Sequence, residues 1–348
     1  MSERQIRKLK KEEHILTKKL YELVFREDQG AFADYYYEEI ASGNEIYAVL
    51  EGEKVLSMLH LNFYDLVIGE KERKIPYIVA VATHPEHRHQ GYMTALLEKA
   101  MREMAKEGVP FAFLMPAREE IYRPFDFQFI SIQNRMELPV QPYLQQEKLK
   151  ASPASFADVP DLVWFSGRHL KKEKGTFAKR TESYYERMLL EQQACGGDIA
   201  VLTSDGMICG WFYTSYEEKM PEVREAEVAR EWEHLLFPTI ADCFRYDEKV
   251  RLSAFPESLV NEQTEKRPLM MGRILNLSEY LKLVGDHVPE GFAFSVMDRI
   301  VPENRGTFRM QGGQAANIED SIELPIYSIK EIMSKFPLPG PVFLNELV

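Results

Sequence analysis

The sequence has 348 residues, somewhat more than two domains of ~150 residues would need, and its 45% hydrophobic and 28% charged residues are ordinary globular proportions. These proportions exclude collagen-like, disordered and coiled-coil chains. The 43 basic and 55 acidic residues give a net charge of −12, which argues against nucleic-acid binding and suits a cationic partner, although acidity also serves solubility alone.

The N-terminal segment is charged and lacks the apolar stretch of ~7–15 residues that a signal peptide needs, and no stretch approaches a membrane span of ~20 residues. The three cysteines, Cys195, Cys209 and Cys243, fit no metal-binding or thioredoxin-like spacing. We therefore expect a cytoplasmic protein with reduced thiols and without a membrane partner.

Hydrophobic periodicity and turn signals predict a mixed α/β arrangement before residue 84. In chain order, the expected elements are a strand at 3–9, helices at 15–25 and 31–40, and strands at 46–50, 55–66 and 77–83. Glu51-Gly52-Glu53 provides the turn of a hairpin between the second and third of these strands.

A polar loop at 84–91 precedes a strongly amphipathic helix. Its apolar residues recur at helical spacing and its charged residues take the other face. The apolar positions are Met93, Leu96, Leu97, Ala100, Met101 and Met104. Gly108 ends this helix, and we expect a strand at 111–115, a turn at 119–122 and a strand at 127–138.

Residues 139–156 are rich in Gln, Pro, Ser and Lys and read as a linker. The elements that follow repeat the outline of the first third, with helices expected at 159–170 and 182–193 and a hairpin at 199–216. We interpret this as a weak internal duplication, the alternative being accidental similarity of two hairpins. The second copy then continues into 217–233, a charged segment without glycine.

The last part predicts an α+β arrangement, with strands at 269–275, 292–300 and 306–310 and a helix at 329–336. The terminal stretch 342–348 is mostly apolar, so we expect it to be docked rather than free. The sequence thus predicts three domains, at 1–140, 150–265 and 266–348.

The strand, loop and helix of 78–105 form the most specific feature for chemistry. Unpaired backbone N–H groups at a helix N-terminus attract anions, and Gly91 leaves room for close backbone approach after Arg88. A diphosphate would fit such a site. The loop lacks the P-loop signature and the G-x-G-x-x-G of dinucleotide folds, so neither nucleotide motif is supported.

Arg88-His89-Gln90-Gly91-Tyr92-Met93 resembles the Arg-x-x-Gly-x-Gly/Ala pyrophosphate loop of the GNAT acyl-CoA-dependent N-acetyltransferases, although Met93 replaces the last small residue. The stretches 79–85, 114–117 and 121–125 resemble one branch, the enhanced intracellular survival (Eis) proteins, in which a bulky residue is usual at the position of Met93. This resemblance implies an α/β (α+β) chain of two tandem GNAT domains, the second degenerate, followed by a sterol-carrier-protein-like α+β domain. The chain is shorter than usual for that branch.

The resemblance also implies roles for individual residues. Ala80, Val81 and Ala82 hold the pantetheine arm of acetyl-CoA through their backbones, and Ala117 and Arg118 lie near the thioester. The phosphate contacts fall to Arg88, His89, Gln90, Gly91, Tyr92 and Met93. Tyr122 is the general acid, and the α-carboxylate of Val348 is the general base.

This assignment is chemically coherent. An amine attacks a thioester only when neutral, so a base removes its proton, and the departing thiolate gains from a proton donor. A phenol with a pKa of ~10 is protonated at neutral pH, whereas an α-carboxylate with a pKa of ~3.5 is a weak base unless burial raises its pKa or a water intervenes.

Two other interpretations stay open at this point. Tyr122 lies among phenylalanines and could serve core packing alone. His84, His87 and His89 superficially suggest a metal site, but they share one loop, so phosphate contact or solvation is favoured and we expect no metal.

The sequence therefore predicts an acetyl-CoA-dependent N-acetyltransferase acting on a primary amine of a cationic acceptor, such as an aminoglycoside, a polyamine or a lysine side chain. The family resemblance adds a homo-oligomer, in its known form a hexamer. The alternative is a non-catalytic CoA-binding or small-molecule-sensing scaffold. Retention of Tyr122 and of an undisturbed chain end favours the enzyme, because a binder needs neither.

Overall fold

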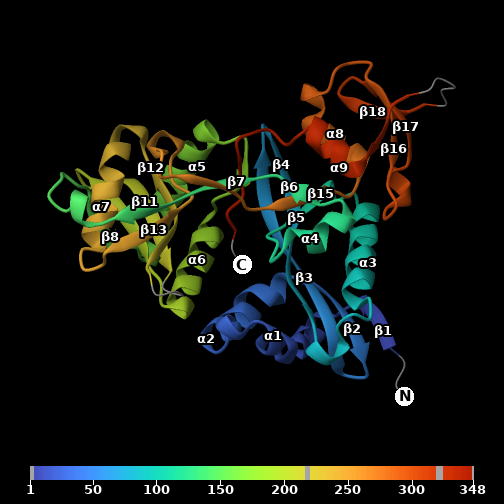
Figure 1. The fold of residues 1–348 in the computed structure, drawn as a ribbon, viewed down its shortest axis with the longest axis horizontal. Helices are drawn as coiled ribbons and strands as arrows, with labels where there is room; N and C mark the ends of the chain where they lie inside the picture. Colours follow the sequence, from blue (N-terminus) through green and yellow to red (C-terminus); the bar gives the residue numbers. More distant parts are fainter. Residues whose placement is uncertain (1–3, 216–219, 319–323, 347–348) are drawn as a thin grey trace. The chain divides into compact units, whose positions relative to one another are not determined.

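The computed structural model describes residues 4–215, 220–318 and 324–346. The chain divides into two compact units. The first comprises Met1–Ser131, Gly175–Ala178 and Leu269–Val348, and the second comprises Ile132–Lys174 and Lys179–Pro268 (Figure 1). The expected boundaries at 140, 150 and 265 stay predictions.

The first unit is built on a nine-stranded sheet with the order β1-β2-β3-β4-β5-β15-β6, to which β9 and β20 add beside β3. Its strands are β1 (Arg4–Lys8), β2 (Glu45–Glu51), β3 (Lys54–Ile68), β4 (Lys71–Thr83), β5 (Phe111–Leu114), β6 (Gln128–Phe129), β9 (Thr176–Ala178), β15 (Met271–Ile274) and β20 (Val342–Phe343). The predicted hairpin is confirmed as β2 and β3, joined by antiparallel pairing from Glu45↔Leu61 to Glu51↔Lys54.

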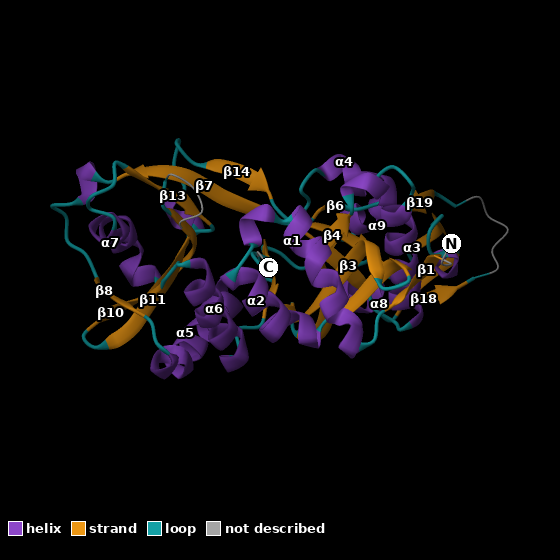
Figure 2. Ribbon diagram, turned by 90° about the horizontal axis from the view of Figure 1, so that it is seen from below, coloured by secondary structure: helices purple, strands orange, loops and turns teal. Residues whose placement is uncertain are grey.

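Helices cover both faces of this sheet, and in Figure 2 β3 lies between α1 and α3. The long amphipathic helix is confirmed as α3 (Tyr92–Lys106), whose predicted apolar stripe packs against Leu59 and Leu61 of β3. The other face carries η1 (Lys11–Thr17), α1 (Lys18–Val24), α2 (Ala31–Tyr35) and the π turn η3 (Tyr36–Ile40). The helix expected at 15–25 therefore starts as a 3₁₀ turn, and Thr17 Oγ donates to the carbonyl of His14 (2.6 Å) at that junction.

The strand expected at 127–138 is wrong as one element. The chain breaks at Ile130 and Ser131, whose amides both donate to Met270 O, and continues as β7 (Ile132–Pro139) in the sheet of the second unit. In the first sheet, β15 lies between β5 and β6. Gly272 permits this insertion, because a Cβ there would lie 2.8 Å from Ile130 Cδ1.

The second unit has a seven-stranded sheet with the order β14-β7-β13-β12-β11-β10-β8. Its further strands are β8 (Lys150–Pro153), β10 (Ile199–Ser204), β11 (Met207–Ser215), β12 (Glu222–Val228), β13 (Lys249–Ser253) and β14 (Glu265–Pro268). Its helices are α5 (Val159–Glu173), α6 (Glu182–Cys195), the 3₁₀ turn η9 (Arg230–Leu235) and α7 (Leu236–Cys243). The expected helices and hairpin are confirmed.

Two expectations for this unit need correction. The linker at 139–156 contains β8, which pairs with β10 as an edge strand. The charged segment at 217–233 contains the interior strand β12, in which Glu225 and Glu227 are buried because Arg180 and Ser166 provide their partners. Residues 217–219 of that segment lie outside the described residues.

The first unit also carries a small α+β part, a four-stranded sheet with the order β18-β17-β16-β19. Its elements are α8 (Leu277–Val284), β16 (Ala293–Met297), β17 (Gly306–Gln311), β18 (Gln314–Asn317), β19 (Ile326–Ser328) and α9 (Ile329–Lys335). The mixed α/β fold class with an additional α+β part is therefore confirmed. Every helix within the described ranges is too short or too polar to cross a bilayer.

Candidate active site

The central feature of the first sheet is an opening between the parallel strands β4 and β5. They pair at Tyr77↔Phe113, and across the described residues no backbone hydrogen bond links 79–83 to β5 beyond that point. The cause is a bulge at Ala80, where φ is 51° and the register against β3 changes from His60↔Val79 to Met58↔Ala82. Beyond the bulge, Ala80, Val81 and Ala82 have no backbone pairing with β5, at the sequence position expected for pantetheine.

The predicted anion site follows directly after β4. Gly91 precedes α3 with φ 77°, and an added Cβ there would meet nothing within 4 Å, so the backbone is open to approach. The first amide with an intrahelical acceptor is that of Ala95, which donates to Gly91 O (3.0 Å). The amides of Tyr92, Met93 and Thr94 have no backbone acceptor among the described residues, so the positive end of a 15-residue helix is unpaired.

The side chains of Gln90 and Tyr92 are held by an arginine of β1, which the sequence did not predict. Tyr92 Oη donates to Gln90 Oε1 (3.0 Å), and the Arg4 guanidinium lies 5.6 Å from the centre of the Tyr92 ring and donates to the Tyr92 hydroxyl. Arg4 in turn pairs with Glu51 Oε1 (3.0 Å). This arrangement adds a cation from β1 beside the loop, and sequence reasoning missed it because 84 residues separate Arg4 from Arg88.

Arg88 and His89 are exposed, and Arg88 Nε donates to Thr83 O (3.4 Å). The ligand-type atoms of His84, Glu86 and His87 lie within 4.8 Å of one another, which sequence reasoning did not anticipate for Glu86. His84 Nδ1, however, accepts the amide of Glu86 (3.3 Å), and Lys54 Nζ lies 3.5 Å from His87 Nε2. An ammonium group at that distance disfavours a bound cation.

Tyr122 ends the short helix α4 (Glu119–Tyr122) and is 7% exposed. Its ring meets that of Phe127 edge to face with centroids 6.0 Å apart, and burial raises the pKa of its hydroxyl to about 12. Within the described residues this hydroxyl has no hydrogen-bond partner. Tyr122 is thus a neutral phenol that is packed on its ring and unengaged at its oxygen. Ala117 and Arg118, just before α4, are exposed.

Val348 lies outside the described residues, so nothing is stated of its carboxylate. The segment before it is described: β20 pairs with β9, and Leu344, Asn345 and Glu346 are buried. β20 runs antiparallel to β3, in the direction from Ile68 towards the middle of that strand.

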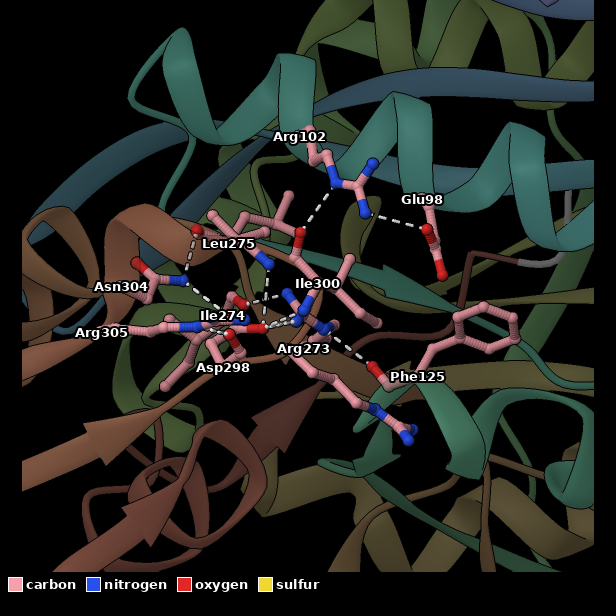
Figure 3. Close-up of polar contacts among 12 residues, drawn as sticks. Glu98, Arg102, Phe125, Arg273, Ile274, Leu275, Asp298, Ile300, Asn304 and Arg305 are labelled. Carbon is pink, nitrogen blue, oxygen red and sulfur yellow. Dashed lines mark hydrogen bonds and ion pairs between the residues drawn. The ribbon is translucent and has the colours of Figure 1, made fainter.

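A buried charge cluster supports the turn that follows Tyr122 (Figure 3). Arg273 of β15 donates through Nε to Phe125 O (2.7 Å) and through a terminal nitrogen to Asp298 Oδ1 (2.8 Å). Both side chains are 0% exposed, and Asp298 also accepts the amides of Ile300 (2.9 Å) and Val301 (3.0 Å).

Further bonds complete this cluster. Asn304 Nδ2 donates to Asp298 Oδ2 (2.9 Å), and Arg299 donates to Pro124 O. The carbonyls of Pro124 and Phe125 are therefore both held by arginines from the last third of the chain. No sequence signal marks this, because Arg273 and Asp298 are each isolated in apolar or loop surroundings.

Comparisons with known proteins identify the domain that contains these residues. Residues 5–130 match the model of the acetyltransferase (GNAT) domain, which gives the chain an N-acetyltransferase domain. A comparison with curated proteins gave no match.

Solved structures share the fold. A probable N-acyltransferase of unknown function from Enterococcus faecalis V583 has a TM-score of 0.76 and 17% identity, covering 96% of this chain and 89% of its own. A GCN5-related N-acetyltransferase from Anabaena variabilis ATCC 29413 has a TM-score of 0.75 and 17% identity, covering 95% and 89%. Eis1 from Mycobacterium abscessus has a TM-score of 0.68 and 14% identity, covering 95% and 89%.

Proposed function

We propose that this protein is an Eis-type N-acetyltransferase that moves the acetyl group of acetyl-CoA to a primary amine of a cationic acceptor. The opening between β4 and β5, continuous in sequence with the unpaired N-terminus of α3, is the observation that carries the proposal. Aminoglycosides, polyamines and lysine side chains are the acceptor classes that suit the net charge of −12.

The residues present fit acetyl-CoA. The unpaired amides after Gly91 and the side chains of Arg88 and Arg4 suit its phosphates, and the bulged backbone of Ala80–Ala82 suits the amides of pantetheine. Acetyl-CoA supplies the activated acetyl thioester. The protein supplies a fixed backbone surface along the end of β4.

Tyr122 is the proposed general acid. Its hydroxyl keeps its proton because burial raises its pKa to about 12, so the acid is present at any physiological pH. Its edge-to-face contact with Phe127 fixes the ring, and the Arg273 cluster fixes the turn that follows.

The Val348 α-carboxylate stays the predicted general base. The burial of Asn345 and Glu346 supports a chain end held inside the first unit. Adding three residues after Val348 should lower kcat with little effect on acetyl-CoA binding. Unchanged activity in that variant would exclude the terminal carboxylate as the base.

The function itself is tested by release of free CoA thiol from acetyl-CoA in the presence of a panel of amines. We expect thiol release that depends on both enzyme and amine. Binding of acetyl-CoA without turnover on any primary amine would contradict the proposal and favour a CoA-binding scaffold.

A further inference from the structure

Three polar atoms on one face of β3 are buried and unpartnered. They are His60 Nε2 and both side-chain atoms of Asn62, Nδ2 and Oδ1. His60 is 0% and Asn62 3% exposed. An unpaired buried donor or acceptor costs about 1–3 kcal/mol, so three such atoms two residues apart require an explanation.

The protonation of His60 follows from its neighbours. Tyr36 Oη accepts a hydrogen bond from Asn44 Nδ2 (3.3 Å) and lies 3.0 Å from His60 Nδ1. Tyr36 is wholly buried, so its one hydroxyl proton points to Nδ1. Burial lowers the pKa of His60 to about 3, so the ring is neutral and carries its proton on Nε2. The face thus offers one N–H donor at His60, and a donor and an acceptor at Asn62.

His60 and Asn62 lie on β3, the strand that borders β4 on the side opposite β5. His60 pairs with Val79, the residue before the bulge at Ala80, and Asn62 pairs with Tyr77, where β4 still meets β5. Their side chains point away from α3, to the face covered by Tyr36 of η3. If phosphates bind at Gly91, beyond the end of β4, the pantetheine arm runs back along β4 and its thioester end approaches Tyr77 and Val79.

We propose that His60 and Asn62 form an acceptor subsite that binds a hydroxyl group carried close to the reacting amine. A hydroxyl oxygen accepts the His60 Nε2–H while its proton is donated to Asn62 Oδ1, which gives partners to two of the three unpartnered atoms at once. An alkylamine without a hydroxyl leaves them unpaired. This inference rests on the proposed function and adds the selection of amino alcohols over plain alkylamines.

Ethanolamine and propylamine test the subsite, because they differ only in a hydroxyl where the other has a methyl group. We expect wild-type kcat/KM to favour ethanolamine by about 10-fold or more. Asn62→Leu, nearly isosteric, and His60→Asn, which keeps an acceptor at the Nδ1 position for Tyr36, should each reduce this ratio towards one while retaining turnover of propylamine.

Thr17→Val is the matched control. Thr17 is a wholly buried polar residue of η1, on the face of the sheet to which His60 and Asn62 point, and its hydroxyl lies 2.8 Å from Tyr37 Oη. Its replacement should leave the ratio of kcat/KM for ethanolamine to that for propylamine unchanged. Folding of the variants is checked by thermal unfolding. Asn62→Leu should not lower Tm, because it removes two unpaired buried atoms.

The outcomes separate the subsite from the proposed function. Turnover of both amines with the same ratio in wild type and Asn62→Leu would overturn the subsite and leave the acetyltransferase standing. Absence of turnover with every primary amine would instead count against the acetyltransferase itself.

Discussion

The sheets of the two units share a bulged strand with a parallel neighbour, but the two strands separate in the first sheet and stay hydrogen-bonded in the second. In each, a bulged strand is followed in parallel by the next strand, β4 by β5 and β12 by β13. The β12 bulge falls at Arg224, where the register against β11 changes from Tyr213↔Glu225 to Thr214↔Val223. Beyond that bulge, however, Ala226 N donates to Ala254 O (3.0 Å), and this bond closes the pair of strands that β4 and β5 leave open.

The segments that follow the two bulged strands also differ in their backbone hydrogen bonds. β4 leads through Gly91 to α3, whose first amides are unpaired. β12 leads to the 3₁₀ turn η9, where the amide of Trp232 already donates to Ala229 O (2.8 Å). The unpaired amides of the first sheet thus stand at the start of a long α-helix, whereas the second sheet leads into a 3₁₀ turn.

The buried polar residues on the helix-covered faces of the two sheets also differ in how many of their atoms have hydrogen-bond partners. In the second unit, Ser166 Oγ accepts from Tyr185 Oη (2.5 Å) and Trp211 Nε1 (2.9 Å) and donates to Glu227 Oε2 (2.9 Å). In the first, His60 Nε2 and both polar side-chain atoms of Asn62 are unpartnered, whereas in this cluster of the second only Glu227 Oε1 is. One glycine and one interstrand hydrogen bond thus distinguish the open strands of the first sheet from the closed strands of the second.

The largest effect is expected from Tyr122, the proposed general acid. Tyr122→Phe should lower kcat by about 100-fold or more, since it removes the proton donor, and leave acetyl-CoA affinity unchanged. Tyr185→Phe, which changes a buried tyrosine of α6 in the second unit, is the control and should affect Tm only. Steady-state thiol release measures both. Equal kcat in wild type and Tyr122→Phe would exclude the acid role.

The pH profile sharpens the same assignment. With the pKa of Tyr122 raised to about 12, its deprotonation should cause no fall in kcat until the pH approaches that value. An alkaline limb with an apparent pKa near 10 that disappears in Tyr122→Phe would show a phenol less buried than described.

The buried ion pairs should separate stability from catalysis. Arg273→Met and Arg180→Met each leave a buried carboxylate, Asp298 or Glu225, without its cation, and should cost about 3–5 kcal/mol of unfolding free energy. We expect reduced kcat only for Arg273→Met, because Arg273 bonds to the turn after Tyr122 and Arg180 lies in the second unit. Denaturant unfolding measures the loss of stability in each variant, and steady-state kinetics measures kcat. An equal loss of kcat in both variants would contradict the positioning role of Arg273.

Two glycines test the anion site. Gly91→Ala and Gly206→Ala replace residues at φ 77° and 80° whose Cβ would meet nothing within 4 Å, so both should lose about 1 kcal/mol of stability through strain. Only Gly91→Ala should also weaken acetyl-CoA binding, by about 10-fold, because its Cβ and altered backbone oppose the approaching phosphates. Isothermal titration calorimetry of acetyl-CoA binding distinguishes the two variants. Equal affinities of Gly91→Ala and Gly206→Ala for acetyl-CoA would show that the phosphates do not bind at Gly91.

The last prediction concerns the closed sheet and its stability alone. Burial raises the pKa of Glu227 to about 8 from 4.5, so the folded state binds the proton more tightly than the unfolded state. Its contribution to stability is complete below about pH 4.5 and is lost as the pH rises through about 8. Glu227→Gln should flatten this decline in a series of unfolding curves. A wild-type curve that rises over this range and is unchanged by Glu227→Gln would contradict it.

Local patterns predicted much of the fold and little of its pairing. The stripe from Met93 to Met104 and the hairpin turn at Gly52 are short-range signals, and both elements are confirmed. The exchange by which β7 joins the second sheet and β15 enters the first depends on contacts more than 130 residues apart in sequence, such as Ile130 to Met270. No periodicity encodes such contacts.

The candidate site divides in the same way. Gly91 and Arg88 were recognisable from spacing, and Tyr122 from resemblance. Arg4 and Arg273 act through tertiary contacts and carry no motif, and the charged segment 217–233 gave no sign that Glu225 and Glu227 are buried. The expected homo-oligomer, cytoplasmic location and sterol-carrier-protein likeness stay predictions.

The stoichiometry of acetyl-CoA binding by isothermal titration calorimetry tests the contrast between the two sheets most directly. An open first sheet and a closed second sheet predict one site per chain, lost when Arg88 is replaced by Glu. Two sites per chain, or one site insensitive to Arg88→Glu and Gly91→Ala, would contradict the assignment of the open strands β4 and β5 as the acetyl-CoA site.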